Sequence, residues 1–328
     1  MTVTAIAHSN IALVKYWGKR DDRLNLPAVG SISITLRDLY TQTLVEFDKS
    51  LHEDEFFLNG QRASKADTER ITYFLDEIRR PLKDVPFARV ESENNFPTGA
   101  GLASSASAFA ALALAATRAL KQNYSPKELS ILARKGSGSA ARSIFGGFVE
   151  MSRGKKKDGT DSFAVQIADE HYWPLDVLVA ITTEEKKAVG STAGMKQSEK
   201  TSPYYAGWIE SSQADIADMR KAISERDFEQ LSEISEHSCL KMHGLMLSTR
   251  PALIYWKAAT IELIQAILDL RKRGIPVFFT IDAGPQVKAI CEPIYSEQVK
   301  SVLESVRDVR RIIHTSLGPG AQIIEEKQ

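Results

Sequence analysis

Hydrophobic positions in the first third of the chain alternate or run in short blocks, as they do in strands. Residues 3–14 and 31–47 are rich in β-branched side chains, and residues 87–92 form a shorter block of the same kind. Asn59-Gly60 lies between two short strand-like runs and is a strong hairpin signal. The pattern predicts a sheet in this part of the chain.

Helical spacing interrupts these blocks at three places. Residues 64–80 open on Ser64, a capping residue, and carry an apolar stripe with helical spacing. Residues 104–120 are small and apolar around most of the helix circumference, which predicts a buried and closely packed helix. Residues 126–135 follow Ser125-Pro126, a pair typical of the first positions of a helix.

The second half has longer helical stretches. Strands are predicted at 146–151, 163–168, 174–182, 277–282 and 311–315, with another short strand after 282, and helices at 206–225, 227–247, 251–273 and near 295–306. The basic run Arg153 to Lys157 lies between two strands and is interpreted as a solvated hairpin tip. Because the helices are grouped and do not alternate strictly with strands, the fold class is α+β.

Length and charge narrow the class of protein. The 328 residues suggest about two domains, and the texture of the pattern changes near residues 170–185. Lys and Arg number 42 and so do Asp and Glu, so the neutral chain is not expected to coat nucleic acid or an anionic membrane. An anionic ligand would have to meet a local cluster of positive charge.

Cysteine usage and the apolar runs indicate a cytoplasmic protein. Cys239 and Cys291 are the only cysteines, which is typical of a reducing compartment. The first twenty residues lack the pattern of a signal peptide. Residues 94–117 are uncharged, but their first half is too polar to cross a bilayer, and a buried helix is expected there.

A glycine- and serine-rich segment at 95–107 is the first candidate for chemistry. Gly99 and Gly101 would let the backbone approach a ligand, and Ser104 and Ser105 open a helix whose first amides point outward. This is a phosphate cradle in physical terms, although it lacks the signatures of a Walker A loop or a Rossmann fingerprint. A plain loop and helix cap is the alternative.

Four other segments carry polar residues in unusual places. Lys15 ends an apolar run, where a lysine is costly unless it is paired. Arg142 lies in a run of small residues at 136–143 that would let it converge with serine hydroxyls on an anion. Residues 189–195 form another turn of hydroxyls and glycines. Asp282 ends a strand beside a tight turn, as either a turn cap or a catalytic group.

Together these segments resemble the diphosphomevalonate decarboxylases, a family of the GHMP kinase superfamily. The resemblance is carried by NIALVKYWGK at 10–19, NFPTGAGLASSASAFAAL at 95–112, GSGSAARSIFGGF at 136–148, GSTAGM at 190–195 and TIDAGP at 280–285. The glycine-serine loop marks only the superfamily, whereas KYWGK, GSGSxxRS and DAGP together are more specific to the decarboxylases.

The resemblance implies a fold and a reaction. An N-terminal ATP-binding domain like domain 2 of ribosomal protein S5 would span 1–180, and a ferredoxin-like C-terminal domain carrying the catalytic aspartate would span 181–328. The active site would lie in the cleft between them. The reaction would be ATP-dependent conversion of (R)-5-diphosphomevalonate to isopentenyl diphosphate, ADP, phosphate and CO2, and the enzyme would be a homodimer.

The resemblance also implies roles for individual residues. Asp282 would be the catalytic base, Lys15 would hold it ionised, and Arg142 with Ser139 would bind the carboxylate and phosphoryl groups. The remaining substrate contacts would be Asn10, Tyr16, Lys19, Ser191 and Thr192. ATP phosphates would be held by Pro97, Gly99, Gly101, Leu102, Ser104, Ser105 and Ser107, with Ser105 toward Mg2+.

Alternatives remain open at this point. GSTAGM lacks a basic residue at 192, which leaves room for a monophosphate substrate, and a GHMP kinase without decarboxylation is a further rival. A serine hydrolase is disfavoured because no G-x-S-x-G elbow is present. His237, Cys239 and His243 match no zinc spacing and are interpreted as core or surface residues of a helix. A non-catalytic ATP-binding module is the last alternative.

Overall fold

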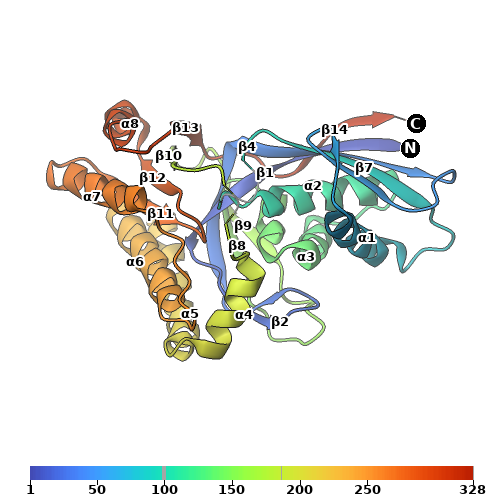
Figure 1. Cartoon of the computed structure of the whole chain (residues 1–328), viewed down its shortest axis with the longest axis horizontal. Coiled ribbons are helices and arrows are strands. Elements are labelled where there is room, and N and C mark those ends of the chain that lie inside the picture. The colour runs from blue at the N-terminus through green and yellow to red at the C-terminus, as the bar shows by residue number, and fades with distance from the viewer. Residues whose placement is uncertain (98–100, 186, 328) are drawn as a thin grey trace.

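The computed structural model describes residues 1–97, 101–185 and 187–327. Figure 1 shows two parts side by side, each with a sheet and its own helices. The structure contains both strands and helices, with the helices grouped along the chain, so the predicted α+β class is confirmed. No helix in the described ranges is long and apolar enough to span a membrane.

The larger part is built on an antiparallel-rich sheet with the order β14-β1-β4-β7-β5-β6, and β8 and β9 extend it from β4. Helix α2 packs on β1 and β4, beside α1 and α3 (Figure 1). Its alanines are buried against the sheet, as the small-residue pattern predicted. The strands are β1 (Thr2–Val14), β4 (Ser31–Asp48), β5 (Glu55–Leu58), β6 (Gln61–Arg62), β7 (Phe87–Asn94), β8 (Phe148–Met151), β9 (Ala164–Ala168) and β14 (Gln322–Lys327).

Short elements complete this part. The Asn59-Gly60 turn joins β5 to β6 with a positive φ at both residues, so the predicted hairpin is confirmed. A small ribbon pairs β2 (Lys19–Asp21) with β3 (Leu26–Pro27). The helices are α1 (Lys65–Arg79), α2 (Ser104–Ala119), α3 (Pro126–Gly136) and a 3-10 segment, η1 (Gly138–Ile144). Ser64 and Ser125 cap α1 and α3 as expected.

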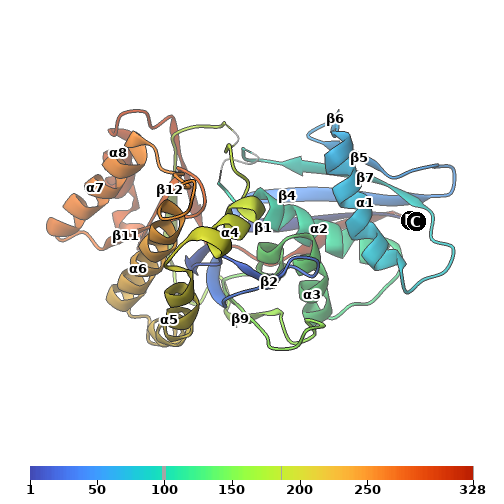
Figure 2. The same ribbon diagram turned by 60° about the horizontal axis from the view of Figure 1, so that its bottom comes forward.

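The smaller part is an antiparallel sheet with the order β11-β12-β10-β13, packed against helices (Figure 2). Its strands are β10 (Asp176–Ile181), β11 (Val277–Ile281), β12 (Val287–Cys291) and β13 (Arg311–Ser316). Its helices are α4 (Ser191–Thr201), α5 (Tyr205–Glu225), α6 (Phe228–Leu247), α7 (Ala258–Lys272) and α8 (Ser296–Glu304), with a 3-10 turn η2 (Pro293–Tyr295).

Three elements differ from the sequence prediction. Residues 251–257 are not helical: they fold back on α6, where Leu253 is buried and donates its amide to Met246 O at 3.1 Å. A helix, α4, is present where the sequence predicted a turn at 189–195. The sequence did not indicate this helix because it buries few apolar side chains and so has no clear apolar stripe. Strand β14 was missed because it is a mostly exposed edge strand with charged residues.

The chain passes between the two sheets more than once. Strand β10 starts the smaller sheet, and β14 returns to pair with β1 of the larger one. The division into domains at 1–180 and 181–328 stays a prediction. The membership of strands in one sheet or the other does not by itself define which residues fold as a unit. Helix α6 contacts both β11 and β1, so the two parts share a packed junction.

Candidate active site

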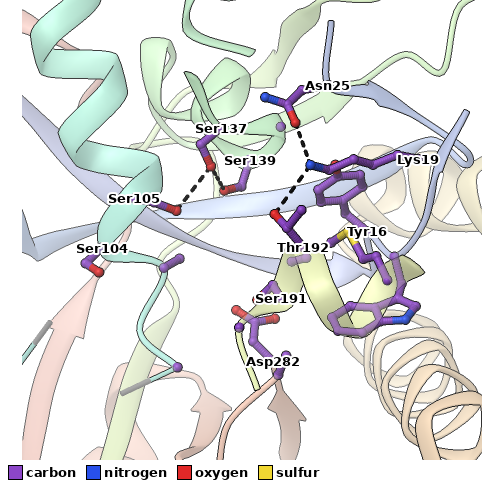
Figure 3. A pocket seen from close by; sticks show the side chains of 18 of the residues that line it. Tyr16, Lys19, Asn25, Ser104, Ser105, Ser137, Ser139, Ser191, Thr192 and Asp282 are labelled. Carbon is purple, nitrogen blue, oxygen red and sulfur yellow. Dashed lines mark hydrogen bonds between the residues drawn. The ribbon is translucent and has the colours of Figure 1, made fainter. Parts of the chain in front are cut away.

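A cavity of about 810 Å³ lies where the larger sheet, the 3-10 segment η1, helix α4 and the end of β11 come together. Figure 3 shows serine hydroxyls of α2 and η1 on one side of it, Tyr16 and Lys19 on another, and Asp282 below. The segments that the sequence singled out, far apart along the chain, therefore meet at one place.

Lys15 and Asp282 form the central polar contact. Lys15 Nζ lies 2.8 Å from Asp282 Oδ1, and the lysine side chain is only 1% exposed whereas the aspartate is 25% exposed toward the cavity. Ser238 of α6 accepts a hydrogen bond from the backbone amide of Lys15 at 3.0 Å, which fixes the end of β1. The lysine in an apolar run is paired, as the sequence required.

The electrostatic surroundings keep Asp282 ionised. Burial by itself raises the pKa of this carboxyl, but Lys15, Lys288 and Arg142 act in the opposite direction and hold its pKa below the ordinary value. The carboxylate therefore stays charged at neutral pH while it faces the cavity. Such a group can accept a hydrogen bond from a hydroxyl and take its proton.

Arg142 is buried and bound only by neutral side chains. Its Nη1 donates to Ser31 Oγ at 2.6 Å, its Nε donates to Ser33 Oγ at 2.9 Å, and its Nη2 donates to Asn10 Oδ1 at 3.0 Å. Burial lowers its pKa to about 10, so it remains a cation. Its guanidinium lines the cavity and makes no ion pair with a carboxylate in the described residues, so its charge is available to an anion.

The hydroxyls beside the glycine-rich loop form a chain. Ser105 Oγ lies 3.1 Å from Ser137 Oγ, which lies 3.2 Å from Ser139 Oγ (Figure 3). Helix α2 begins here behind Ala103, which has a left-handed conformation and supplies no capping side chain. The first amides of α2, with the positive end of its dipole, are directed to this side of the cavity.

The opposite side combines a second helix start with Lys19 and Tyr16. Lys19 Nζ donates to Asn25 Oδ1 at 2.6 Å and to Thr192 Oγ1 at 3.4 Å (Figure 3). Helix α4 begins at Ser191 after Gly190, again without a capping side chain. The Tyr16 hydroxyl is buried and has no hydrogen-bond partner in the described residues. An anion here would meet amides, an ammonium and an unsatisfied hydroxyl.

The predicted site residues divide into three groups. Asn10, Tyr16, Lys19, Gly101, Leu102, Ser104, Ser105, Ser139, Arg142, Ser191, Thr192 and Asp282 line the cavity. Lys15 lies just behind Asp282. Ser107 lies on the buried face of α2, where its hydroxyl is 2.7 Å from Thr41 Oγ1. Pro97 is not among the described residues that line the cavity. Gly99 lies outside the described residues.

Several lining residues were missed from the sequence. Lys187 Nζ donates to Ser191 Oγ at 2.7 Å and to Ala283 O at 2.9 Å, and burial lowers its pKa although Asp282 opposes the shift. Nothing in the charged run 184–187 distinguishes this lysine from a solvated one. Arg70 of α1 and Lys196 of α4 also line the cavity, and only the fold brings them there.

The charge of the cavity is strongly positive. Its described lining contains five cationic side chains and one carboxylate, Asp282; the cations are Lys19, Arg70, Arg142, Lys187 and Lys196. The local cluster of positive charge that a neutral chain would need for an anionic ligand is therefore present. Two of these cations, Lys19 and Lys187, bond the hydroxyls of Thr192 and Ser191 at the start of α4, so basic groups lie beside the motif GSTAGM, which has none of its own.

The residues of the rejected zinc pattern have other surroundings. Cys239 and His243 are buried on α6, and His237 is exposed on the same helix. Ile281 N donates to Cys239 Sγ at 3.2 Å, and Trp256 Nε1 donates to His243 Nε2 at 3.3 Å. Across the described residues, no group of three or more His, Cys, Asp or Glu could hold a metal ion.

Comparisons with known proteins agree with this geometry. A model of the diphosphomevalonate decarboxylase-like N-terminal domain matches residues 7–164, and a model of the mevalonate 5-diphosphate decarboxylase C-terminal domain matches residues 177–311. A diphosphomevalonate decarboxylase of Candida albicans is 36% identical over 357 residues, covering 99% of this chain and 98% of the relative.

Solved structures give the same result. A structure described as MDDEF in complex with MVAPP, AMPPCP and magnesium superposes with a TM-score of 0.93, at 40% identity, covering 99% of both chains. The mevalonate diphosphate decarboxylase of Staphylococcus aureus has a TM-score of 0.93 at 39% identity, covering 99% of this chain and 98% of that one. The two-part GHMP kinase type of fold is confirmed.

Proposed function

The chain belongs to the diphosphomevalonate decarboxylase family, and from this membership we propose which cavity residues bind the substrates and which react. The enzyme catalyses the ATP-dependent decarboxylation of (R)-5-diphosphomevalonate to isopentenyl diphosphate, ADP, phosphate and CO2. ATP and Mg2+ are its cofactors. The observation that carries the assignment of residues is the Lys15–Asp282 pair, 2.8 Å apart, on an otherwise cationic cavity wall.

Asp282 is the base for the first step. Its carboxylate orients the C3 hydroxyl and accepts the proton as the hydroxyl oxygen attacks the γ-phosphorus of ATP and ADP leaves. Lys15 is not among the described residues that line the cavity. It acts through its hydrogen bond to Asp282, which keeps the carboxylate charged and in place. The C–C bond to the carboxylate then breaks, its electrons form the C=C bond, and phosphate leaves from C3 as CO2 departs.

Arg142 positions the group that is lost. A guanidinium held by Ser31, Ser33 and Asn10 has a fixed plane and can bind a carboxylate with two parallel hydrogen bonds. Ser139, which lies in the same segment as Arg142, contributes a hydroxyl on the same wall. Holding the carboxylate in place favours loss of CO2 over other fates of the phosphorylated intermediate.

The diphosphate of the substrate is assigned to the α4 side. This part of the cavity is faced by Tyr16, Lys19, Ser191 and Thr192, and the buried Tyr16 hydroxyl has no hydrogen-bond partner in the described residues. Lys187 extends the group, because it already bonds Ser191 and the residue after the base. These groups favour a substrate with two phosphoryl groups over one with a single phosphate, since several donors are directed to the same region.

The nucleotide phosphates are assigned to the start of α2. The open helix terminus and the hydroxyls of Ser104 and Ser105 fit a polyphosphate, and Gly101 and Leu102 line the approach. Mg2+ typically takes most of its ligands from phosphates, waters and one or two protein oxygens, and the Ser105 hydroxyl is the proposed protein ligand. Bound Mg2+ supplies charge neutralisation on the phosphates.

The test of this function measures the products together. Purified protein with MgATP and diphosphomevalonate should release ADP, phosphate and CO2 in equal amounts. ADP released without CO2 would show a kinase that does not decarboxylate. With phosphomevalonate in place of the diphosphate, kcat/KM should fall by about 100-fold or more, since loss of charge-assisted contacts costs about 3 kcal/mol; a preference for the monophosphate would overturn the substrate assignment.

We also propose that the enzyme is a cytoplasmic homodimer, as expected for the family. Two exposed leucines on α6, Leu240 and Leu247, and two exposed isoleucines, Ile254 and Ile261 in or before α7, supply apolar surface away from the cavity lining. Both cysteines are buried free thiols, in keeping with a reducing compartment. Sedimentation velocity should give a dimer mass, and cell fractionation should recover activity with cytoplasmic markers.

A further inference from the structure

Lys288 is a buried lysine that the assignments above leave without a role. It lies on β12, the second strand of the smaller sheet, and is only 1% exposed. No carboxylate lies within ion-pair distance of it among the pairs found in the described residues. Burying an ammonium without such a partner is unfavourable, so its retention calls for a physical reason.

The hydrogen bonds of Lys288 join two segments that meet at the cavity. Its Nζ donates to Gly101 O at 3.0 Å, at the end of the glycine-rich loop, and to Gln286 O at 3.2 Å, just after the catalytic turn. Gly101 has φ +83° and lies so close to Gly284 that a Cβ at 101 would be 2.9 Å from Gly284 Cα. Gly101, at the end of the glycine-rich segment, is thus seated directly on the turn that follows Asp282.

Gln286 continues this junction on the far side. Its Oε1 accepts from Thr182 N at 2.7 Å, and its Nε2 donates to Thr183 O at 2.5 Å. The turn from Asp282 to Gln286 is therefore tied to the end of β10, while Lys288 ties it to the loop before α2. Gln286 and Lys288 are both buried, so water does not compete for their hydrogen bonds.

Lys288 also acts on Asp282 through its charge: burial lowers the pKa of Lys288 to about 8, so the ammonium is charged on the acid side, where Asp282 titrates. Burial raises the pKa of Asp282, and Lys288 is one of the three cations that lower it, after Lys15 and before Arg142. Lys288 is absent from the described cavity lining, so it does not replace a substrate contact. Its influence reaches the chemistry only through the carboxylate and through the position of the loop.

We propose that Lys288 is a positioning residue that fastens the end of the glycine-rich loop, at Gly101, to the catalytic turn and brings a second positive charge to the turn that carries Asp282. The inference rests on the proposed function, in which the loop holds the nucleotide and Asp282 is the base. In-line phosphoryl transfer needs the phosphorus and the attacking hydroxyl in fixed register. The Lys288 ammonium bonds the end of the loop that holds ATP and also acts on Asp282, the base for the substrate hydroxyl, and in this way it helps to set that register.

Two variants separate the two parts of this role. Lys288→Met removes both the donor and the charge, whereas Lys288→Gln removes the charge but keeps an N–H donor one bond shorter. Lys288→Met should lower kcat and raise the KM for ATP, each by about tenfold, and move the acidic limb of kcat/KM to higher pH. Lys288→Gln should recover much of the ATP affinity while the acidic limb stays displaced. Lys272→Met, an exposed lysine of α7, is the matched control and should behave as wild type.

Other groups near Asp282 do not account for such a displacement. The other cations around this carboxylate are Lys15, which follows β1, Arg142 of η1 and Lys187. Burial lowers the pKa of Arg142 only to about 10, so it keeps its charge on the acid side. On α6, burial lowers the pKa of His243 to about 3 and raises that of Cys239 to about 11. Neither of these two changes charge between about pH 4 and about pH 7, where a displaced Asp282 limb would appear.

The outcomes distinguish the inference from its premise. Unchanged ATP KM and an unchanged acidic limb in folded Lys288→Met would overturn the positioning role, and so would losses that only follow a lower Tm in both variants. Nucleotide affinity measured by calorimetry gives a readout that does not depend on turnover, and Lys288→Gln provides it if the Met variant fails to fold. Normal turnover in Asp282→Asn would instead refute the proposed base, whatever Lys288 does.

Discussion

The two ends of the cavity hold their polar groups in different ways. At the base end, Lys15 and Arg142 are 1% and 2% exposed; Lys15 is bound to Asp282 at the cavity wall, and Arg142 is bound to the buried Ser31. At the phosphate end, Lys19 and Ser191 are partly exposed and Thr192 is exposed at the start of α4. Buried groups cannot reorient cheaply, whereas exposed lysines can follow an anion in and out of water. The base end is built for geometry and the phosphate end for capture and release.

The difference predicts that substitutions at the base end lower kcat, whereas those at the phosphate end raise KM. The largest effect is expected for Asp282→Asn. The amide keeps the shape of the carboxylate but cannot accept the hydroxyl proton, so kcat should fall by about 10³-fold. Nucleotide affinity, measured by calorimetry, should stay within about threefold of wild type.

Asp269→Asn is the matched control for the base. Asp269 is an exposed carboxylate of α7 that pairs with Lys272, and its removal should leave kcat unchanged. Equal losses in the two variants would mean that the loss at 282 is not a property of the base end.

Arg142→Lys should give the next largest effect, a loss of kcat of about 100-fold, because an ammonium cannot reproduce the planar pair of donors. Arg134 is the comparison: it too is buried, but it donates to the backbone carbonyls of Leu24, Gly159 and Ser162. Arg134→Lys should lower Tm while turnover per folded molecule is kept. The opposite pattern in steady-state kinetics and thermal melts would contradict the assignment of Arg142 to the substrate.

A pH profile tests the electrostatics of the base end. Burial raises the pKa of Asp282 and Lys15 lowers it, so Lys15→Met should raise this pKa and protonate the carboxylate at a higher pH. The acidic limb of kcat/KM should therefore move upward by about one pH unit, a loss of about tenfold on the limb. Lys19→Met should leave the limb in place. If the acidic limb moved equally in Lys15→Met and Lys19→Met, the proposed electrostatic difference between the two ends would be wrong.

Lys19→Met probes the phosphate end. Loss of one charge-assisted contact should raise the KM for diphosphomevalonate by about tenfold, equivalent to about 1.4 kcal/mol, with little change in kcat. Because Asn25 and Thr192 are its partners in the free protein, Tm should change little. A fall in kcat with KM unchanged would place Lys19 among groups that act in the transition state.

The smallest effect is expected for Tyr16→Phe. Its hydroxyl is buried and has no hydrogen-bond partner in the described residues, so removing it relieves an unsatisfied group and should leave Tm unchanged or slightly higher. Substrate KM should rise by about fivefold, the value of one neutral hydrogen bond. A lower Tm with unchanged KM would show that the hydroxyl serves the fold and not the substrate.

The base end was largely predictable from the sequence, and the phosphate end only in part: Lys19, Ser191 and Thr192 were expected there, but the additional cations were not. Lys15 in an apolar run and Asp282 at a strand end are conspicuous because burial makes each costly alone. Lys187, Arg70 and Lys196 lie in ordinary polar surroundings along the chain, and only tertiary packing turns them toward the cavity. Helix α4 was missed for the same reason, since its few buried residues leave no clear stripe.

The regular elements followed their local signals closely. Ser64, Ser125 and the Asn59-Gly60 turn mark boundaries by hydrogen-bonding chemistry that needs no tertiary context. The exceptions are segments whose burial comes from distant partners. Residues 251–257 carry apolar side chains that pack on α6 as an irregular segment, and β14 owes its place to β1, more than 300 residues earlier in the chain.

The Lys15–Asp282 bond has a further meaning, because its two members come from different sheets. Lys15 ends β1 of the larger sheet, and Asp282 ends β11 of the smaller one. Neither half contains a complete acid–base unit, so neither half expressed alone could inherit the reaction. The activity belongs to the junction, and it requires that both halves be held together so that this pair can form.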